Sequence, residues 1–167
     1  MLGSKLSGLR FTALGGCVVL LVNTAIAQSV DPHVGTWKLN IAKSTFGPQA
    51  SRQPPLGSTT TIESVGAGFR IQISRDLPDG TVTRFGFTAD FNGKDRPIVG
   101  DPNTDTVALT RIHERMFMMV NKKDGKVTAT QVSSVSADGQ LRILTTTGVS
   151  AAAGQSVNGP VRVWDRQ

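Results

Sequence analysis

The 167-residue chain has no tyrosine, one cysteine and two histidines. The missing tyrosine excludes a binding pocket built on phenol hydroxyl groups. Cys17 lies in an N-terminal segment that we expect to be removed, so no disulfide is available to the remaining fold. Of the two histidines and two glutamates, His113 and Glu114 are adjacent in a predicted connection, whereas His33 and Glu63 are far from them in sequence. A metal site needs three or four converging ligands, which these few residues do not supply in any recognisable spacing.

Motifs for catalysis are also missing. The sequence contains no Gly-x-Ser-x-Gly and no phosphate-binding glycine loop. Residues 101–105 imitate the first half of a calcium loop, but Thr106 and Ile112 stand where that loop needs glycine and glutamate. Turn formation accounts for these residues, with a looser surface cation site as the alternative. We therefore expect no catalytic residues, no metal and no cofactor, and an enzyme is the least favoured function.

Long hydrophobic runs are absent except near the N-terminus. Lys5 and Arg10 precede an apolar run over residues 13–22. After the run, Ala25-Ile26-Ala27 has the spacing that signal peptidase accepts. The run is shorter than the roughly 20 residues of a spanning helix. We expect a signal peptide over residues 1–27, an exported periplasmic or secreted protein, and no stable membrane span. A retained anchor, or lipidation of Cys17 in a lipoprotein-like box, is the alternative.

The charge balance is basic but dispersed. Removing residues 1–27 removes two positive charges and no negative one, which lowers the net charge from +6 to +4. The remaining lysines and arginines are scattered without forming a run. Together with export, this argues against a nucleic-acid partner, whereas anionic envelope components and an anionic small ligand both stay open as partners.

Residues 28–167 are predicted to form a single domain of about ten short strands. Turn signals such as Asn92-Gly93 separate segments of alternating apolar and polar residues. We expect a mobile lead-in over residues 28–33 and an extended surface connection or lid over residues 42–58, which contain three prolines. The predicted strands cover residues 34–41, 59–65, 69–74, 81–91, 98–99, 106–112, 116–121, 126–135, 141–149 and 161–166.

This spacing of strands predicts an all-β protein. A meander of about 8–10 strands is most simply stabilised by closing into an antiparallel up-and-down β-barrel, because closure removes exposed sheet edges. A β-sandwich is the alternative architecture. The pattern does not define an oligomeric state.

Both ends of the predicted barrel carry a family resemblance. Val34-Gly35-Thr36-Trp37-Lys38-Leu39 resembles the opening strand of the lipocalin and fatty-acid-binding (calycin) superfamily, marked by Gly-x-Trp. The final strand, Val161 to Gln167, is similar to the closing strand of fatty-acid-binding proteins, with Trp164 in place of the tyrosine of Arg-x-Tyr. The resemblance implies that the two strands are neighbours, that Trp37 plugs one end, and that Arg162 helps to hold a ligand carboxylate.

The middle of the chain resembles a second group. Residues 92–100 and 106–109 are similar to secreted bacterial proteins of uncharacterised function, and this likeness covers most of residues 28–167. It brings no activity with it.

The resemblance and the apolar alternation together define candidate ligand-binding residues. An indole N–H at Trp164 points differently from a tyrosine hydroxyl, so the ligand chemistry need not match the family. We expect apolar walls and an arginine anchor, as in most small-molecule sites. The candidates are Arg162, Trp164, Trp37, Phe69, Ile71, Phe85, Phe87 and Met118.

Several orientations stay open at this stage. Arg162, Trp164 and Arg166 share one face of the last strand, and either they or Val161 and Val163 can face inward. An inward Arg162 would need an anion, because a buried unpaired charge is costly.

Two arginines, one strand and one tryptophan also have two interpretations each. Arg84 and Arg111 are either internal cations or solvated strand residues. The strand Met116 to Val120, apolar on both faces, is either a pocket wall or a subunit contact. Trp37 is expected to pack in the closed end in preference to contacting a ligand directly.

The leading functional hypothesis is an exported lipocalin-like barrel. It would bind a small apolar or amphipathic, acidic lipid-like ligand. A ligand-free envelope structural or interaction module is the alternative.

Overall fold

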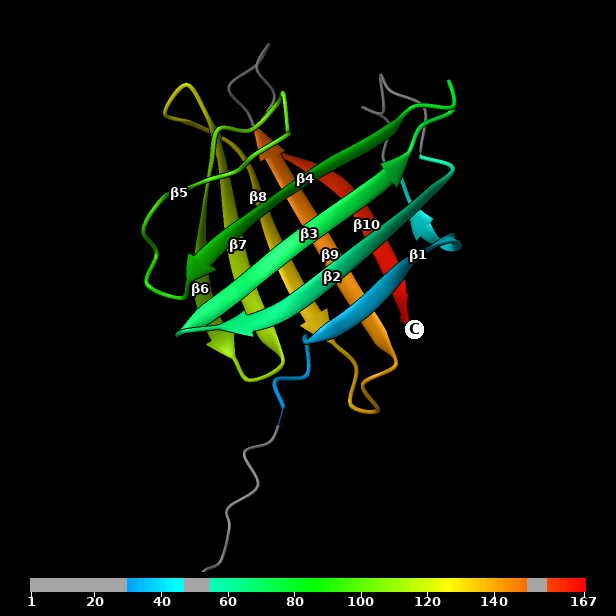
Figure 1. Cartoon of the computed structure of the whole chain (residues 1–167), viewed down its shortest axis with the longest axis horizontal. Coiled ribbons are helices and arrows are strands. Elements are labelled where there is room, and N and C mark those ends of the chain that lie inside the picture. The colour runs from blue at the N-terminus through cyan, green and yellow to red at the C-terminus, as the bar shows by residue number, and fades with distance from the viewer. Residues whose placement is uncertain (1–29, 47–54, 150–155) are drawn as a thin grey trace, which may run out of the picture.

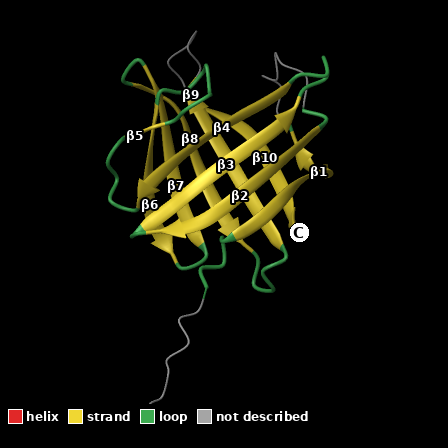
Figure 2. Ribbon diagram, viewed as in Figure 1, coloured by secondary structure: helices red, strands yellow, loops and turns green. Residues whose placement is uncertain are grey.

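The computed structural model describes residues 30–46, 55–149 and 156–167. Figure 2 shows these residues as strands joined by loops. The strands, in chain order, are β1 (Gly35–Thr45), β2 (Gly57–Val65), β3 (Gly68–Asp76), β4 (Val82–Asp90), β5 (Arg96–Pro97), β6 (Thr106–His113), β7 (Met116–Lys123), β8 (Lys126–Val135), β9 (Leu141–Val149) and β10 (Ser156–Arg166).

The strands form one antiparallel sheet in the order β4-β3-β2-β1-β10-β9-β8-β7-β6-β5. Every neighbouring pair except β1 and β10 is consecutive in sequence, as in an up-and-down meander. In Figure 1 the strands β2, β3 and β4 cross in front of β6 to β9, so that the sheet wraps around its own interior. The predicted all-β, up-and-down barrel is confirmed.

The first and last strands close one seam of the barrel. Trp37 pairs with Arg166 and Leu39 pairs with Trp164 in an antiparallel register. The same β1 pairs with β2 on its other side. This confirms the predicted contact between the tryptophan-bearing opening strand and the arginine-bearing final strand.

The second seam, between β4 and β6, is held more sparsely. Gly86 exchanges two backbone hydrogen bonds with Val99, and an isolated bridge joins Asn92 to Thr110. Between these points β5 pairs with β6 through Arg96 and Pro97. The barrel is therefore nearly closed, with a continuous seam at β1/β10 and a discontinuous one beside β4.

Three predicted boundaries are wrong. The segment 42–58 is a surface connection only in part, because residues 42–45 extend β1 and residues 57–58 begin β2; residues 47–54 lie outside the described part of the chain. The last strand begins at Ser156, five residues earlier than predicted. The brief edge strand is Arg96–Pro97 rather than 98–99, since Val99 turns away from β6 to bridge β4.

An irregularity in β1 changes which side chains face inward. The register between β1 and β10 shifts between Asn40 and Thr45. Alternation predicts that Ile41 follows Trp37 and Leu39 into the core, but Ile41 is 41% exposed. A bulge adds an unpaired residue and so reverses the facing of the residues beyond it. The Ser44 hydroxyl occupies the irregular region, donating to Asn40 O and accepting from the Val163 amide.

One end of the barrel is sealed by residues 31–34, which we call the plug. The predicted mobile lead-in is wrong for residues 31–33, because His33 is fully buried and its backbone oxygen accepts a 2.8 Å hydrogen bond from Trp37 Nε1. Arg166 lies over the Trp37 ring, 4.2 Å from its centroid, and donates to Val34 O, Pro32 O and Gly139 O. Plug, first strand and last strand are thus fastened together.

Gly35 makes this contact possible. It has φ +137°, and a Cβ at this position would lie 2.7 Å from Arg166 Nη1. Only glycine adopts that backbone conformation easily while leaving room for the guanidinium. The glycine of Gly-x-Trp is therefore explained by the approach of Arg166.

The signal peptide predicted over residues 1–27 lies outside the described residues. Within the described part of the chain, no helix has the length and apolar character needed to cross a membrane.

Trp37 should contribute strongly to stability. Trp37→Ala removes a side chain with no exposed surface, and we expect the free energy of unfolding to fall by about 3–5 kcal/mol. Val99→Ala, at a side chain that is 74% exposed, is the control and should change it by less than about 0.5 kcal/mol. Urea unfolding of the three proteins tests this. Equal losses of unfolding free energy in both variants would contradict the assignment of Trp37 to the core.

Candidate functional site

The inward-facing side chains form an apolar wall. Cross-strand pairs place Ile71 opposite both Ile62 and Phe87, and Phe69 opposite Ala89. The core built from these rows comprises Trp37, Leu39, Ile62, Phe69, Ile71, Phe87, Ala89, Val107, Leu109, Phe117, Met119, Val135 and Trp164. Of the predicted ligand-binding residues, Trp37, Phe69, Ile71, Phe87 and Trp164 are buried here, and the half-buried Phe85 lies on the same inward row as Ile73.

Met118 is not in this wall. Its neighbours Phe117 and Met119 are buried in the core, so alternation puts Met118 on the outer face, opposite Thr110 and Val132. The prediction that Met118 lines the interior is wrong by one residue. When a strand is apolar on both faces, its sequence does not show which alternate side chains face the interior.

Arg162 faces inward, which settles the two orientations of the last strand. It pairs with the buried Leu144 and lies on the same row as Trp164 and Leu39. Burial, and next the charge of Arg75, lower the pKa of Arg162 to about 10. Arg75 belongs to an inward row of β3, 5.0 Å over the Phe85 ring. Two guanidinium groups therefore lie near each other inside an apolar wall.

Among the described residues, no carboxylate forms an ion pair with Arg162. A charge in this position is more costly than one in water unless an anion compensates it. With a pKa near 10 the side chain is still protonated at neutral pH. The geometry therefore offers a cationic anchor within an apolar interior.

The two other arginines considered as internal cations, Arg84 and Arg111, lie on opposite faces of the sheet. Arg84 is exposed on the outer face of β4. Arg111 points inward, 3.8 Å over the Phe91 ring, and forms an ion pair with Asp31 of the plug. Arg111 is thus an internal cation that the protein neutralises itself.

The plug contains a polar cluster that sequence reasoning missed. His33 packs edge-on against Phe117, with ring centroids 4.7 Å apart, and its Nδ1 lies 3.2 Å from Asp31 Oδ1. Burial lowers the pKa of His33 to about 4; Asp31 opposes this shift and Arg142 adds to it. The imidazole is therefore neutral at pH 7. Nothing in a lone histidine near the N-terminus indicated such burial.

This cluster lacks the arrangement of a catalytic pair. The His33 ring has no exposed surface, and Asp31 is already bound to Arg111. His113, the other histidine, is exposed in the connection to β7. The Asp101 carboxylate accepts the Asn103 amide at 2.9 Å, the turn chemistry expected there. Among the described residues there is no group of three or more potential metal ligands.

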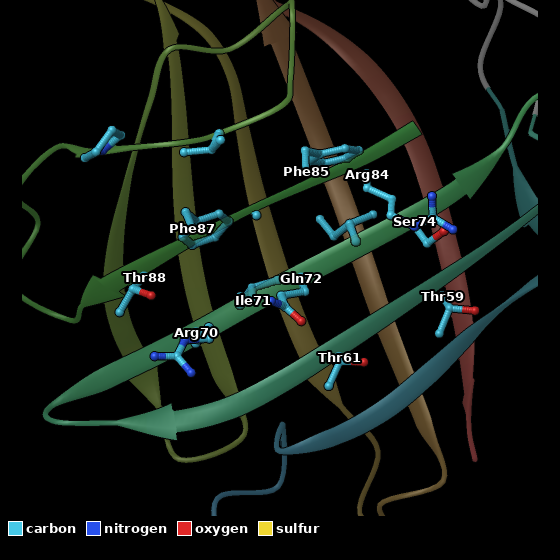
Figure 3. A pocket seen from close by; sticks show the side chains of 14 residues that line it. Thr59, Thr61, Arg70, Ile71, Gln72, Ser74, Arg84, Phe85, Phe87 and Thr88 are labelled. Atoms are coloured by element: carbon cyan, nitrogen blue, oxygen red, sulfur yellow. The ribbon is translucent and has the colours of Figure 1, made fainter. Parts of the chain in front are cut away.

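A second concave region lies on the outer face of β2, β3 and β4. Figure 3 shows this groove, which has a volume of about 740 Å³. Its outward side chains are polar: Thr59, Thr61, Arg70, Gln72, Ser74, Arg84 and Thr88, with Pro97 and Val99 along one side. Ile71, Phe85 and Phe87 also border it, but they lie on the inward rows. The groove is open to water, so its arginines carry little of the desolvation cost that Arg162 carries.

The strands define a fold, a nearly closed, ten-stranded up-and-down barrel like that of fatty-acid-binding proteins. It is similar to zebrafish ileal bile acid-binding protein, whose crystal structure is a complex with cholic acid. The two are 14% identical, with a TM-score of 0.52 over 81% of this chain and 99% of that chain. No protein-family model and no curated protein matches the sequence. The likeness is therefore one of fold.

The buried His33 should make the protein less stable in mild acid. Between its ordinary pKa of 6.5 and about 4, the unfolded chain takes up a proton that the folded chain excludes. The His33 contribution is complete above pH 6.5 and decreases as the pH falls toward 4, by on the order of 2–3 kcal/mol.

His33→Phe keeps an aromatic ring against Phe117 but cannot be protonated. We expect its unfolding free energy to change less than that of the unaltered protein across this pH range, as measured by urea unfolding. The lowered pKa values of Asp79, Asp105, Asp138 and Asp165 affect both proteins alike. Parallel pH profiles would show that His33 is not the group responsible.

Proposed function

We propose that the protein binds an amphipathic small molecule with an apolar body and an acidic group inside the barrel. Arg162 is the anchor for the acidic group, and the apolar body lies against Ile71, Phe85 and Phe87. The observation that carries this proposal is the half-buried, inward-facing Arg162, which has no acidic partner among the described residues.

Electrostatics supports an anionic ligand over a neutral one. Burial and, after it, the positive charge of Arg75 lower the pKa of Arg162, so the two positive charges lie close enough to disfavour each other. A carboxylate near both would relieve this repulsion and accept charge-assisted hydrogen bonds. A neutral apolar ligand would exclude water without compensating the charge of Arg162.

The walls suit the rest of such a molecule. Inward rows of β3 and β4 are aromatic and aliphatic, and polar anchors are few, the usual composition of a small-molecule site. The similar zebrafish protein is a bile acid-binding protein in complex with cholic acid. Its ligand is an acid with a large hydrocarbon body, which is the chemistry proposed here.

The outer groove favours a second candidate function, an interaction module. Its polar face could contact a partner through Gln72 and Arg84 without any interior ligand. The two candidates differ in which arginine matters, Arg162 in the interior or Arg84 on the outer face.

Competition binding with a fluorescent fatty acid tests the proposal. Arg162→Met removes the charge but keeps an apolar side chain, and we expect it to weaken binding of a fatty acid by roughly 10- to 100-fold, as for loss of a charge-assisted hydrogen bond. Arg84→Met is the matched control on the outer wall and should bind like the unaltered protein.

Thermal unfolding of both variants shows whether they remain folded. Unchanged fatty-acid affinity in folded Arg162→Met would rule out the anchor. Loss of binding in Arg84→Met alone would move the site to the outer groove. If no acid of any chain length displaces the probe from the unaltered protein, the interior is not a lipid site.

We also propose that the chain is exported and that the mature protein begins at Gln28. The basic residues, the apolar run and Ala25-Ile26-Ala27 support this. Expression in a bacterium with periplasmic secretion, followed by N-terminal sequencing, should give Gln28 as the first residue. Ala27→Asp, which places a charge at the expected cleavage position, should leave the precursor uncleaved. An intact N-terminus on the unaltered protein, or acylated Cys17, would contradict the cleavage site.

A further inference from the structure

A second charged position exists deeper in the barrel. Three buried polar side-chain atoms have no hydrogen-bond partner among the described residues: His33 Nε2, Arg142 Nη1 and Trp164 Nε1. Buried donors are satisfied in most native proteins, so each such atom calls for an explanation. Arg142 and Trp164 are opposite each other across β9 and β10, and the charge of Arg142 acts on His33 of the plug.

Of the three side chains, Arg142 most needs a partner, because it carries a buried positive charge. It is 3% exposed, and its Nε donates to Ser133 Oγ at 2.9 Å. It is opposite Trp164 across β9 and β10, with its guanidinium carbon 5.6 Å from the indole ring. No carboxylate of the described residues pairs with it. One hydroxyl and one aromatic face do not neutralise a fully buried guanidinium.

His33 bounds this position without supplying a donor to it. Its Nδ1 faces the Asp31 carboxylate, which favours the proton on that nitrogen. Nε2 then carries a lone pair and is an acceptor at neutral pH. The donors available to an incoming group are therefore Arg142 Nη1 and Trp164 Nε1, which together suit an oxyanion.

This position is separate from the anchor at Arg162. Arg162 is two residues from Trp164 along β10, on the side away from the plug, and its positive neighbour is Arg75. For Arg142, burial alone lowers the pKa, to about 10. Arg142 is paired with Trp164 and Arg162 with Leu144, so the two guanidinium groups extend from different cross-strand pairs.

We propose that Arg142 and Trp164 form a second interior anion site, which takes a carboxylate or an inorganic oxyanion of similar size. Resting on the proposed function, this gives the ligand two acidic groups, one for each site. The other source of the same chemistry is a free anion bound beside a mono-acid. Either source satisfies the two orphaned donors and the buried charge.

Formate is the probe for the deep site, because it is the smallest carboxylate. Thermal unfolding of the ligand-free protein is followed as sodium formate replaces sodium gluconate at constant ionic strength. We expect a saturable rise in the melting temperature of a few degrees, as for any ligand that binds only the folded state. The rise should persist in Arg162→Met and disappear in Arg142→Met.

Arg142→Met has a second expected property. Without formate it should melt higher than the unaltered protein, because an apolar side chain replaces an uncompensated buried charge. Trp164→Phe keeps an aromatic side chain but removes the Nε1 donor together with part of the indole ring system, so it should show a weaker formate response. A formate response that is equal in Arg142→Met and the unaltered protein overturns the site, as does the absence of any response to formate and to diacids alike.

Matched mono- and dicarboxylic acids of the same chain length then separate the two sources. Binding of the diacid at least roughly tenfold tighter, with that advantage lost in Arg142→Met, supports a ligand with two acidic groups. Equal affinities with a formate response that needs Arg142 support a free anion at the site.

The outcomes also separate this proposal from the proposed function. If the unaltered protein binds neither acid but responds to formate through Arg142, the deep site stands and the lipid-binding function fails. If mono-acids bind through Arg162 while neither formate nor the second acid group depends on Arg142, the function stands and the deep site fails.

Discussion

The contact between Arg166 and Trp37 fixes the closure on which the rest of the barrel depends. The guanidinium stacks on the indole and donates to carbonyl groups of the plug and of the 136–140 turn, while the backbone on either side pairs β1 with β10. A single arginine thereby joins the plug and the last strand to the hairpin between β8 and β9. Closure removes the two longest unpaired edges and creates an interior from which water is excluded.

That interior determines what each inward arginine requires. Arg166 is satisfied by backbone carbonyls at the barrel end, and Arg111 by the carboxylate of Asp31. Arg142 and Arg162 face the same apolar interior with no carboxylate from the described residues. The protein has thus compensated two of these cations and left two without a carboxylate, Arg142 beside the plug and Arg162 on the side away from it. One buried and one half-buried guanidinium group without a carboxylate, in a barrel stabilised largely by apolar packing, support the proposal that anions bind there.

The strands could be predicted from the sequence, whereas several orientations could not. Turn residues such as Asn92-Gly93 and the alternation around Phe69 and Ile71 are local signals, and they led to nearly all of the strands. The prediction that Met118 faces the interior was wrong because the strand from Met116 to Val120 is apolar on both faces. The prediction that Ile41 faces the core was wrong because an irregularity after Asn40 changes which side chains of the strand face inward. A shift of one residue reverses the face of every side chain beyond it, so small local errors change the proposed site.

The sequence by itself determined an all-β meander, the pairing of its first and last strands, and Arg162 as a candidate anchor. Each of these depends on patterns within about ten residues, or on the resemblance of the two ends to a known family. Only the tertiary structure decided that His33 is buried, that Arg111 is paired and that Arg142 is not. The cost of a buried charge depends on which groups surround it, and those groups come from strands far apart in the chain.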